Sequence, residues 1–404
     1  MSVDPSLIAE VKQAHLDVYG VDPVGVVASP GRVNLIGEHT DYNEGFVLPL
    51  AIDRHTVLGF TPRADRLVRL WSKSFANGVD DVVEFDIDAI GDGGANGGRA
   101  PADYARGVAH VLSRYGEELG VHGPTLHGCD MSVVSNLPIG AALSSSASFE
   151  LAVMMAFVSS TPGARFLPLV AARLGQLVEN RWIGLQSGIM DQMVCASAKE
   201  GFALLVDCRD LASGNVVIPE GVSVVVLDTG KRRELAGSEY NVRRAQCVEA
   251  ARVFGVSALR DATEAMLAEH KDALDDVVYR RARHVIGENA RTTAAAAALK
   301  SGDLARVGAL MRASHASLRD DYEVSVRELD VMADVANAHP FVIGARMTGG
   351  GFGGCAVALV DSSKPGQLET FCRDVEAGYR AQSECEPAVY ACVASEGTHV
   401  VGAA

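Results

Sequence analysis

The segment from residue 31 to residue 49, GRVNLIGEHTDYNEGFVLP, sets an apolar run beside a dense group of ionisable side chains. Three of its residues have the apolar character of core positions: Val33, Leu35 and Ile36. A cation, two acids and an imidazole flank them: Arg32, Glu38, Asp41 and His39. Because charged groups are costly to bury unless partners or a ligand satisfy them, the segment predicts a core strand that borders a polar site.

Size and charge limit the class of protein. With 404 residues, the chain is long enough for two domains with substantial cores. The formal net charge of -15 argues against a general affinity for nucleic acid or an anionic membrane, whose phosphates would be repelled. The first residues lack the pattern of a signal peptide, no apolar run is long enough to span a membrane, and the eight cysteines are scattered without a CxxC pair. We therefore expect a cytoplasmic protein with reduced cysteines and no nucleic-acid or membrane partner. A monomer is our expectation for the oligomeric state, although none of these features bears on it.

Strand and helix patterns divide the chain into two α+β halves. Runs rich in β-branched residues and punctuated by Pro and Gly indicate strands in both halves. Helical patterns cover residues 6–19, 103–115, 145–158, 167–182 and much of 240–336. We predict an N-terminal domain over residues 1–205 and a C-terminal domain over residues 206–404, with a small-molecule cleft between them. The Gly-rich loop at residues 91–99 either moves over that cleft or only connects two elements.

The stretch PIGAALSSSASFELA, residues 138–152, has the character of an anion-binding loop. A loop without bulky side chains lets backbone N–H groups converge, and the helix that follows adds unpaired donors and the positive end of its dipole. A serine can also simply cap the helix, but one cap does not account for three serines in a row. The stretch therefore predicts phosphate binding, with a serine hydroxyl able to reach a phosphate-bound Mg²⁺.

A second Gly-rich stretch, MTGGGFGGCAVALV at residues 347–360, formally contains GxGxxG. In dinucleotide-binding proteins that fingerprint follows a strand and opens a helix, whereas here a strand-like run follows it. We therefore reject a nicotinamide site, and the glycines indicate either a tight connection or a close approach of a ligand to the backbone. The chain also lacks the P-loop sequence and the signatures of protein kinases.

A third stretch, ENRWIGLQSGIMDQM at residues 179–193, holds two acids of interest. Asp191 lies near the start of a predicted helix, where the dipole stabilises a carboxylate, and a simple helix-start acid is an equally good interpretation. Glu179 lies near the end of the preceding predicted helix, where the dipole disfavours an acid. Its position suggests that something cationic compensates it.

Together these stretches resemble galactokinases of the GHMP small-molecule kinase superfamily. Three separated blocks carry the resemblance, namely the segment 31–49, LSSSAS at 143–148 and ARMTGGGFGGCAVALV at 345–360. The resemblance implies a two-domain α+β protein with the GHMP kinase architecture and its active site between the domains. It also implies transfer of a phosphoryl group from MgATP to the anomeric hydroxyl of galactose.

The resemblance assigns roles to individual residues. The sugar would be bound by Glu38, His39, Thr40, Asp41 and Tyr240, although Tyr240 alone reads equally well as an aromatic residue of an amphipathic helix. Asp191 would accept the proton of the attacking hydroxyl, or only orient that hydroxyl, and Arg32 would keep Asp191 ionised and steady the developing charge. The nucleotide would be held by Gly140, Ala141, Ala142, Leu143, Ser144, Ser145, Ser146 and, as the weakest match, Ser72. The Mg²⁺ ligands would be Ser146 and Glu179.

The chain also departs from the family pattern. Ala142 stands where a glycine is usual, and because a positive φ would strain alanine, we expect Ala142 to adopt a conformation with negative φ. Gln186 and Trp182 differ from the residues common near the sugar site and bear on substrate identity. Arabinose and N-acetylgalactosamine are therefore alternative substrates, and a galactokinase-like sugar sensor is the alternative from another class.

Overall fold

Helices and strands are mixed along the whole chain in the computed structural model, which describes residues 3–94, 98, 100–232 and 236–402. For residues 236–238 only the backbone is described. The strands are β1 (Gly25–Asn34), β2 (Phe46–Val47), β3 (Pro49–Pro62), β4 (Leu67–Ser72), β5 (Val83–Asp86), β6 (Cys129–Ser135), β7 (Phe202–Asp207), β8 (Ser213–Val217), β9 (Val222–Asp228), β10 (Val342–Met347), β11 (Cys355–Asp361), β12 (Ala388–Cys392) and β13 (His399–Val400). The helices are α1 (Pro5–Tyr19), α2 (Pro101–Tyr115), α3 (Ser145–Ser160), α4 (Pro168–Leu177), α5 (Met190–Ser197), α6 (Ala236–Phe254), α7 (Glu264–Glu269), α8 (Asp276–Ser301), α9 (Leu304–Asp320), α10 (Arg327–Asn337) and α11 (Gln367–Arg380).

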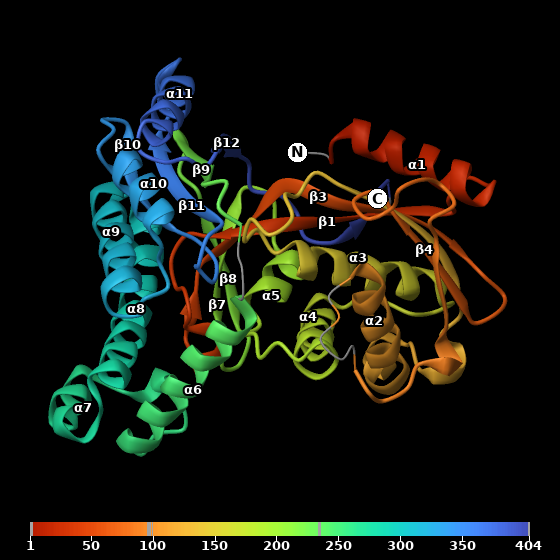
Figure 1. Ribbon diagram of the computed structural model, residues 1–404, viewed down its shortest axis with the longest axis horizontal. Helices are drawn as coiled ribbons and strands as arrows, with labels where there is room; N and C mark the ends of the chain where they lie inside the picture. Colours follow the sequence, from red (N-terminus) through yellow and green to blue (C-terminus); the bar gives the residue numbers. More distant parts are fainter. Residues whose placement is uncertain (1–2, 95–97, 99, 233–235, 403–404) are drawn as a thin grey trace.

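A six-stranded sheet forms the first half, in the order β13-β1-β3-β6-β4-β5. Its neighbouring strands are antiparallel except for the parallel pair β4 and β6. Helix α1 packs on one face of this sheet, and α3 and α5 pack on the other, as Figure 1 shows. Helix α3 is apolar around nearly its whole circumference because it lies between the sheet and the helices α2, α4 and α5. This layer thus includes both α3, which follows the loop 140–146, and α5, which holds Asp191.

A four-stranded antiparallel sheet forms the second half, in the order β10-β11-β9-β12. Its central strand β9 alternates between two apolar cores, as the period of a strand dictates. Val225 and Leu227 pack against α10 and α11. Val224 and Val226 face the opposite core, which α8 and α9 complete. Both faces of this sheet are therefore covered.

The apolar residues of the segment 31–49 belong to the second of these cores. Val33, Leu35 and Ile36 are each at most 1 % exposed and pack in one cluster with residues of β9, β11, α8 and α9. The N-terminal segment is thus anchored in the core of the C-terminal half. The ionisable residues of the segment are consequently held at the junction of the two halves.

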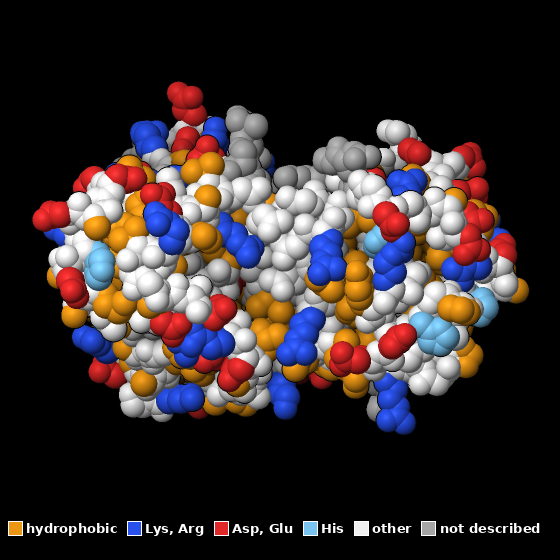
Figure 2. Space-filling view, turned by 90° about the horizontal axis from the view of Figure 1, so that it is seen from below, with side chains coloured by type: hydrophobic (Ala, Val, Ile, Leu, Met, Phe, Trp, Pro, Cys, Tyr) orange, Lys and Arg blue, Asp and Glu red, His pale blue; other side chains and the backbone are white. Residues whose placement is uncertain are grey.

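The two halves exchange strands, which bears on the predicted domain boundary. Residue 205 lies inside β7, which pairs with β2 and β8 in a third, three-stranded sheet. The last strand, β13, returns to pair with β1. A division into residues 1–205 and 206–404 stays a prediction, and it would cut across two sheets. Figure 2 shows two lobes joined in the middle, with acidic and basic side chains interspersed over the visible face.

Most of the predicted elements agree with the structure, and the α+β fold class is confirmed. The predicted helix at residues 167–182 is α4 followed by a π-helical segment, Val178–Ile183. All eight cysteines lie in the described residues, and none of them is joined in a disulfide. In the described part of the chain, no helix is long and apolar enough to cross a bilayer.

Candidate active site

A cavity of about 460 Å³ lies at the junction of the two halves. Most of the residues predicted for the site line it: Arg32, Glu38, His39, Asp41, Ser72, Gly140, Ala142, Leu143, Ser144, Ser145, Ser146, Glu179, Asp191 and Tyr240. Two predicted residues do not line it. Ala141 is fully buried behind the loop, and the hydroxyl of Thr40 donates to the backbone carbonyls of Gly37 and Phe46 at 2.9 and 2.7 Å. The structure therefore does not bring Thr40 to the cavity, because its only hydroxyl shapes the turn of its own segment.

Arg32 and Asp191 form a two-pronged ion pair in the wall of the cavity. Nε of Arg32 donates to Oδ1 of Asp191 and Nη2 donates to Oδ2, both at 2.8 Å. The third nitrogen, Nη1, donates to the carbonyl oxygen of Ala142 at 2.5 Å. The Arg32 side chain is 4 % exposed and the Asp191 side chain 28 % exposed. The carboxylate therefore faces the cavity while the guanidinium holds it from behind.

Local backbone features aim these two side chains. The pairing of β1 with β3 shifts register between Pro30 and Arg32, and such an irregularity re-aims the side chains that follow it. Asp191 lies in the first turn of α5, where the dipole favours a negative charge. Burial alone would lower the pKa of Arg32, but the Asp191 and Glu38 carboxylates raise it above its ordinary value. Arg32 is therefore a permanent cation beside Asp191.

The loop from Gly140 to Ser146 adopts a left-handed backbone at several positions. Gly140, Ala142 and Ser144 have φ values of 72°, 67° and 59°. The expectation that Ala142 avoids a positive φ is therefore wrong. The surroundings of Ala142 hold its backbone in this conformation. Its carbonyl oxygen accepts a hydrogen bond from Arg32, and its Cβ packs so closely on Gly354 that a Cβ added to Gly354 would lie 2.7 Å from it.

We expect the substitution Ala142→Gly to raise the free energy of unfolding by up to about 1 kcal/mol. A left-handed conformation costs an L-residue roughly 1–2 kcal/mol, and the larger backbone entropy of glycine in the unfolded chain offsets part of that gain. Denaturant unfolding of the two proteins measures the difference. A variant clearly less stable than the parent would show that the methyl packing against Gly354 outweighs the strain.

Two of the three serines of the loop donate hydrogen bonds to different carboxylates. The hydroxyl of Ser144 donates to Oδ2 of Asp191 at 2.5 Å, and the hydroxyl of Ser146 donates to Oε1 of Glu179 at 3.1 Å. Ser145 is the first residue of α3 and lines the cavity. Ser144 occupies the N-cap position of α3 without a capping bond from its side chain. Helix capping is therefore not what these serines share, and the unpaired N–H groups at the start of α3 stay available to an anion.

Glu179 lies in the π-helical segment that follows α4. Such segments are rare and frequently occur at functional sites. The Glu179 carboxylate accepts hydrogen bonds from Ser146 and from the hydroxyl of Ser187 rather than from a cation. Burial raises the pKa of Glu179, and the negative charge of Asp191 adds to that rise. A carboxylate in this setting is well placed to receive a cation.

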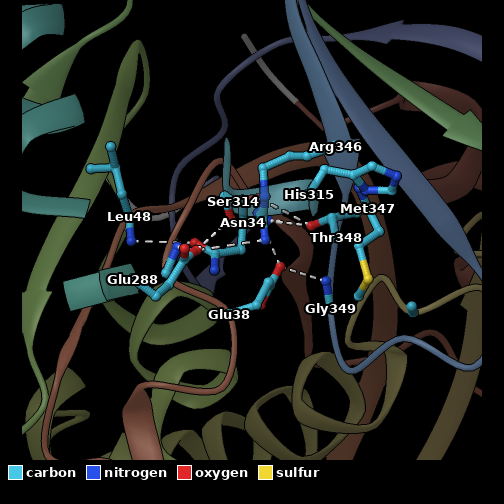
Figure 3. A network of polar contacts seen from close by, with 12 residues as sticks. Asn34, Glu38, Leu48, Glu288, Ser314, His315, Arg346, Met347, Thr348 and Gly349 are labelled. Atoms are coloured by element: carbon cyan, nitrogen blue, oxygen red, sulfur yellow. Dashed lines mark hydrogen bonds and ion pairs between the residues drawn. The ribbon is translucent and has the colours of Figure 1, made fainter. Parts of the chain in front are cut away.

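Glu38 is buried in a polar network that joins the two halves (Figure 3). Its Oε1 accepts from the backbone N–H of Gly349 at 2.6 Å and from Nη1 of Arg346 at 3.4 Å. Nη1 of Arg346 also donates to the carbonyl oxygen of Asn34 at 3.0 Å. On the other side of Arg346, 3.9 Å from its Nη2, lies Oε1 of Glu288. Arg346 thus stands, fully buried, between two buried carboxylates.

His39 and Asp41 complete the side of the cavity nearest the C-terminal half. His39 has a φ of 62°, and its Nδ1 lies 2.8 Å from the hydroxyl of Tyr42. The Asp41 carboxylate accepts from the backbone N–H groups of Tyr42 and Met190 at 3.0 and 3.4 Å. Gly188 packs so closely against this carboxylate that any Cβ there would collide with it. Burial, followed by the charge of Asp191, raises the pKa of Asp41 to about 6.

The sequence interpretation missed the residues that hold the site from behind. Arg346, Glu288 and Ser187 each contact a predicted site residue or its immediate partner. Arg346 lies in the stretch that the sequence analysis considered only for its glycines. The available signal was a charged residue within an apolar, strand-like run, next to those glycines. For Glu288 the signal was weaker, because an acid on a helix is usually a solvated residue.

Comparison with known proteins relates the chain to one family of kinases. Three family models match, described as a galactokinase galactose-binding signature at residues 13–62, a GHMP kinases N-terminal domain at 103–199 and a GHMP kinases C-terminal domain at 295–377. A galactokinase of Roseiflexus sp. (strain RS-1) is 43 % identical over 393 residues, which is 96 % of each chain. The crystal structure of Lactococcus lactis galactokinase complexed with galactose superposes with a TM-score of 0.87 at 32 % identity, over 97 % of this chain and 99 % of that one. Methanococcus jannaschii mevalonate kinase, at 18 % identity, superposes with a TM-score of 0.60 over 92 % of this chain and 98 % of its own, which shows a shared fold.

Proposed function

This chain belongs to the galactokinase family of the GHMP kinases, and from that premise we propose how its residues act as a sugar 1-kinase. The reaction transfers the γ-phosphoryl group of ATP to the anomeric hydroxyl of D-galactose, giving galactose 1-phosphate and ADP. One observation carries the assignment of the residues. Asp191, held by Arg32 and Ser144, faces a cavity that Glu38, His39 and Asp41 line on one side and the loop 140–146 lines on another.

We propose that Asp191 is the residue that acts on the attacking hydroxyl. Its carboxylate accepts that proton, or orients the hydroxyl for in-line attack, since phosphoryl transfer depends mainly on positioning and charge neutralisation. Arg32 binds Asp191 with two nitrogens and the loop carbonyl of Ala142 with the third. The same guanidinium therefore fixes the distance between the acceptor of the proton and the loop that would hold the phosphates, and its charge favours the developing negative charge.

The sugar would lie against Glu38, His39, Asp41 and Tyr240. Sugar hydroxyls donate and accept, and carboxylates give the stronger, charge-assisted hydrogen bonds. Tyr240, on α6, lines the cavity with its ring 5.5 Å from that of His39, which supports a sugar contact over the alternative of a plain helix aromatic. Thr40 would act indirectly, by fixing the turn that presents His39 and Asp41.

We expect sugar affinity to fall as pH drops through about 6. The pKa of Asp41 is raised to about 6, so below that pH the carboxyl is neutral and loses its charge-assisted hydrogen bonds to the sugar. The effect on folding has the opposite sign. Between its ordinary pKa and about 6 the folded state binds more protons than the unfolded state, so the free energy of unfolding contributed by Asp41 rises as pH falls.

Calorimetry of sugar binding and denaturant unfolding between pH 5 and 8 measure both effects. The variant Asp41→Asn is the matched control, and we expect it to bind weakly at pH 7.5, with a smaller pH dependence of both affinity and stability. Parallel pH curves for the two proteins would remove Asp41 from the site.

The residues at the other end of the cavity fit a nucleotide and its metal ion. Ser146 and Glu179 offer a hydroxyl and a carboxylate oxygen 3.1 Å apart, and hard oxygen donors of this kind suit Mg²⁺ when phosphate oxygens complete its shell. Bound there with ATP, the ion would neutralise phosphate charge. The backbone N–H groups of the loop 140–146 and the start of α3 would bind the phosphates, and Ser72 lines the same cavity. Cytoplasmic location and a monomeric state stay predictions from the sequence.

Release of ADP from MgATP in the presence of a panel of sugars tests the function. We expect strong preference for galactose over glucose, arabinose, galactosamine and N-acetylgalactosamine. Preference for arabinose or N-acetylgalactosamine would mean that the residues around Gln186 alter specificity without changing the chemistry. Sugar binding without ADP release would favour the sensor instead.

A further inference from the structure

A chain of hydroxyl and thiol groups leads away from His39 into the C-terminal half. Nδ1 of His39 lies 2.8 Å from the hydroxyl of Tyr42, which lies 2.7 Å from the hydroxyl of Tyr322. The Tyr322 hydroxyl in turn lies 3.1 Å from Sγ of Cys247. Three consecutive hydrogen bonds thus connect the imidazole at the cavity with a buried thiol.

Distant parts of the chain supply these groups. His39 and Tyr42 come from the N-terminal segment, Cys247 from α6, and Tyr322 from the turn after α9. Tyr322 is fully buried, with its ring centroid 4.7 Å from that of His39 and 4.5 Å from that of His284. The imidazole of His39 is therefore fixed by ring packing as well as by its hydrogen bond.

The backbone also favours one placement of His39. Its φ of 62° is uncommon for a residue other than glycine. The side-chain amide of Asn43 donates to the carbonyl oxygen of His39 at 2.9 Å and supports this conformation. Strain that is held in place by specific partners is a recurrent feature of ligand-binding positions.

Every group behind His39 is able to donate a proton into the chain. Burial holds the pKa values of Tyr42 and Tyr322 well above their usual range, and it raises the pKa of Cys247 to about 11. All three therefore keep their protons at neutral pH. If the thiol donates to Tyr322, Tyr322 donates to Tyr42 and Tyr42 donates to Nδ1, each of these protons is used in a hydrogen bond.

The residues that line the cavity favour the same order of donors, from Cys247 toward Nδ1 of His39. The groups that line it near His39 include the carboxyl groups of Glu38, Asp41 and Asp191, which serve a sugar as acceptors when ionised. A sugar oxygen also needs a donor, and an imidazole with its proton on Nε2 supplies one. The reverse direction would put the proton on Nδ1 and turn Nε2 into one more acceptor.

We propose that Tyr42 and Tyr322 are positioning residues that fix His39 as the tautomer protonated on Nε2, so that His39 donates a hydrogen bond to the sugar. The part of this inference that concerns the sugar rests on the proposed function. The part that concerns the tautomer is a property of the free protein. The two are therefore separable by experiment.

The substitution Tyr322→Phe tests the inference because it deletes one hydroxyl and keeps the ring. Proton–nitrogen correlation spectra of protein labelled with ¹⁵N-histidine distinguish a protonated ring nitrogen from a bare one, and the spectrum of His39→Gln identifies the His39 signals. In the parent protein we expect Nδ1 bare and Nε2 protonated. In Tyr322→Phe we expect a mixture of tautomers, galactose affinity about 3- to 10-fold weaker, and kcat at saturating sugar within about 3-fold of the parent.

Tyr379→Phe is the matched control. Tyr379 is also fully buried, and its hydroxyl donates to the carbonyl oxygen of Thr229 at 2.8 Å, in the core between α11 and the second sheet. This variant should leave both the His39 spectrum and galactose affinity unchanged. Cys247→Ala removes the last group of the chain without touching a ring, and we expect a smaller shift in the direction of Tyr322→Phe.

Each outcome decides the inference. A proton on Nδ1 in the parent protein, whether as the other tautomer or as the doubly protonated ring, would overturn it. So would a Tyr322→Phe variant with the parent spectrum and affinity, or an equal loss of affinity in Tyr379→Phe. If galactose does not bind the parent protein while Nδ1 is bare and responds to Tyr322→Phe, the tautomer assignment stands and the proposed function fails.

Discussion

Replacing Asp191 by asparagine is expected to lower kcat by about 10³- to 10⁴-fold while changing galactose affinity by less than about 5-fold. A positioned acid or base contributes roughly 10²- to 10⁴-fold to a rate, and its loss is felt mainly in the transition state. The amide keeps the shape of the carboxyl group but cannot accept the proton of the sugar hydroxyl. Steady-state ADP release gives kcat, and calorimetry gives the affinity.

Asp130→Asn controls for the damage that an amide causes beside an arginine. Asp130, on β6, is 6 % exposed and accepts two hydrogen bonds from the guanidinium of Arg69, as Asp191 does from Arg32, but it is not among the residues that line the cavity. Both variants should lose stability, and only Asp191→Asn should lose turnover. Near-normal turnover by Asp191→Asn would leave Asp191 with a purely structural role.

The sequence predicted the site best where a residue's role depends on its immediate neighbours. The loop 140–146, the strand with Arg32 and the helix start with Asp191 are local features, and all of them line one cavity. Local reasoning failed at Ala142, because the positive φ there is imposed from outside the loop by Arg32 and by the close approach of Gly354. The resemblance placed Thr40 among the sugar contacts with its neighbours, whereas the hydroxyl of Thr40 is used by the backbone of its own turn.

Contacts between distant segments were beyond the reach of the sequence pattern. The pairing of β13 with β1 joins the two ends of the chain, so a division near residue 205, which stays a prediction, would cut across this sheet. The partners of Glu38 come from β10 and the glycines that follow it. Such contacts depend on how the strands and helices pack, which a single sequence does not reveal. The same holds for Tyr322, whose contact with Tyr42 spans 280 residues.

The second large effect is expected from replacing Arg346, and it is an effect on stability. We expect Arg346→Met to lower the free energy of unfolding by about 3–5 kcal/mol, because removing one member of a buried ion pair leaves the other as an uncompensated charge. Glu38 and Glu288 are both buried, and Arg346 lies between them. Arg291 also binds Glu288 and holds its pKa at about 2 against the effect of burial, so Glu38 is the carboxylate that loses most.

Arg281→Met is the matched control for a buried arginine. Arg281 is 2 % exposed, but its carboxylate partner, Glu323, has a side chain that is 43 % exposed and regains water when Arg281 is removed. We therefore expect a smaller loss of stability for Arg281→Met than for Arg346→Met. Arg346→Lys keeps the charge and should recover a large part of the stability lost in Arg346→Met.

Galactose affinity should distinguish the effect of Arg346 on Glu38 from a general loss of stability. Burial raises the pKa of Glu38, and Arg346 is the strongest of the groups that oppose this rise. Without Arg346 the carboxyl group becomes neutral at a higher pH and loses its charge-assisted hydrogen bonds to the sugar. Arg346→Met should therefore bind galactose about 10-fold more weakly at pH 7, with part of the affinity restored as pH rises. Equal galactose affinity in the folded form of Arg346→Met and in the parent protein would show that Arg346 supports the fold alone and that Glu38 stays ionised without it.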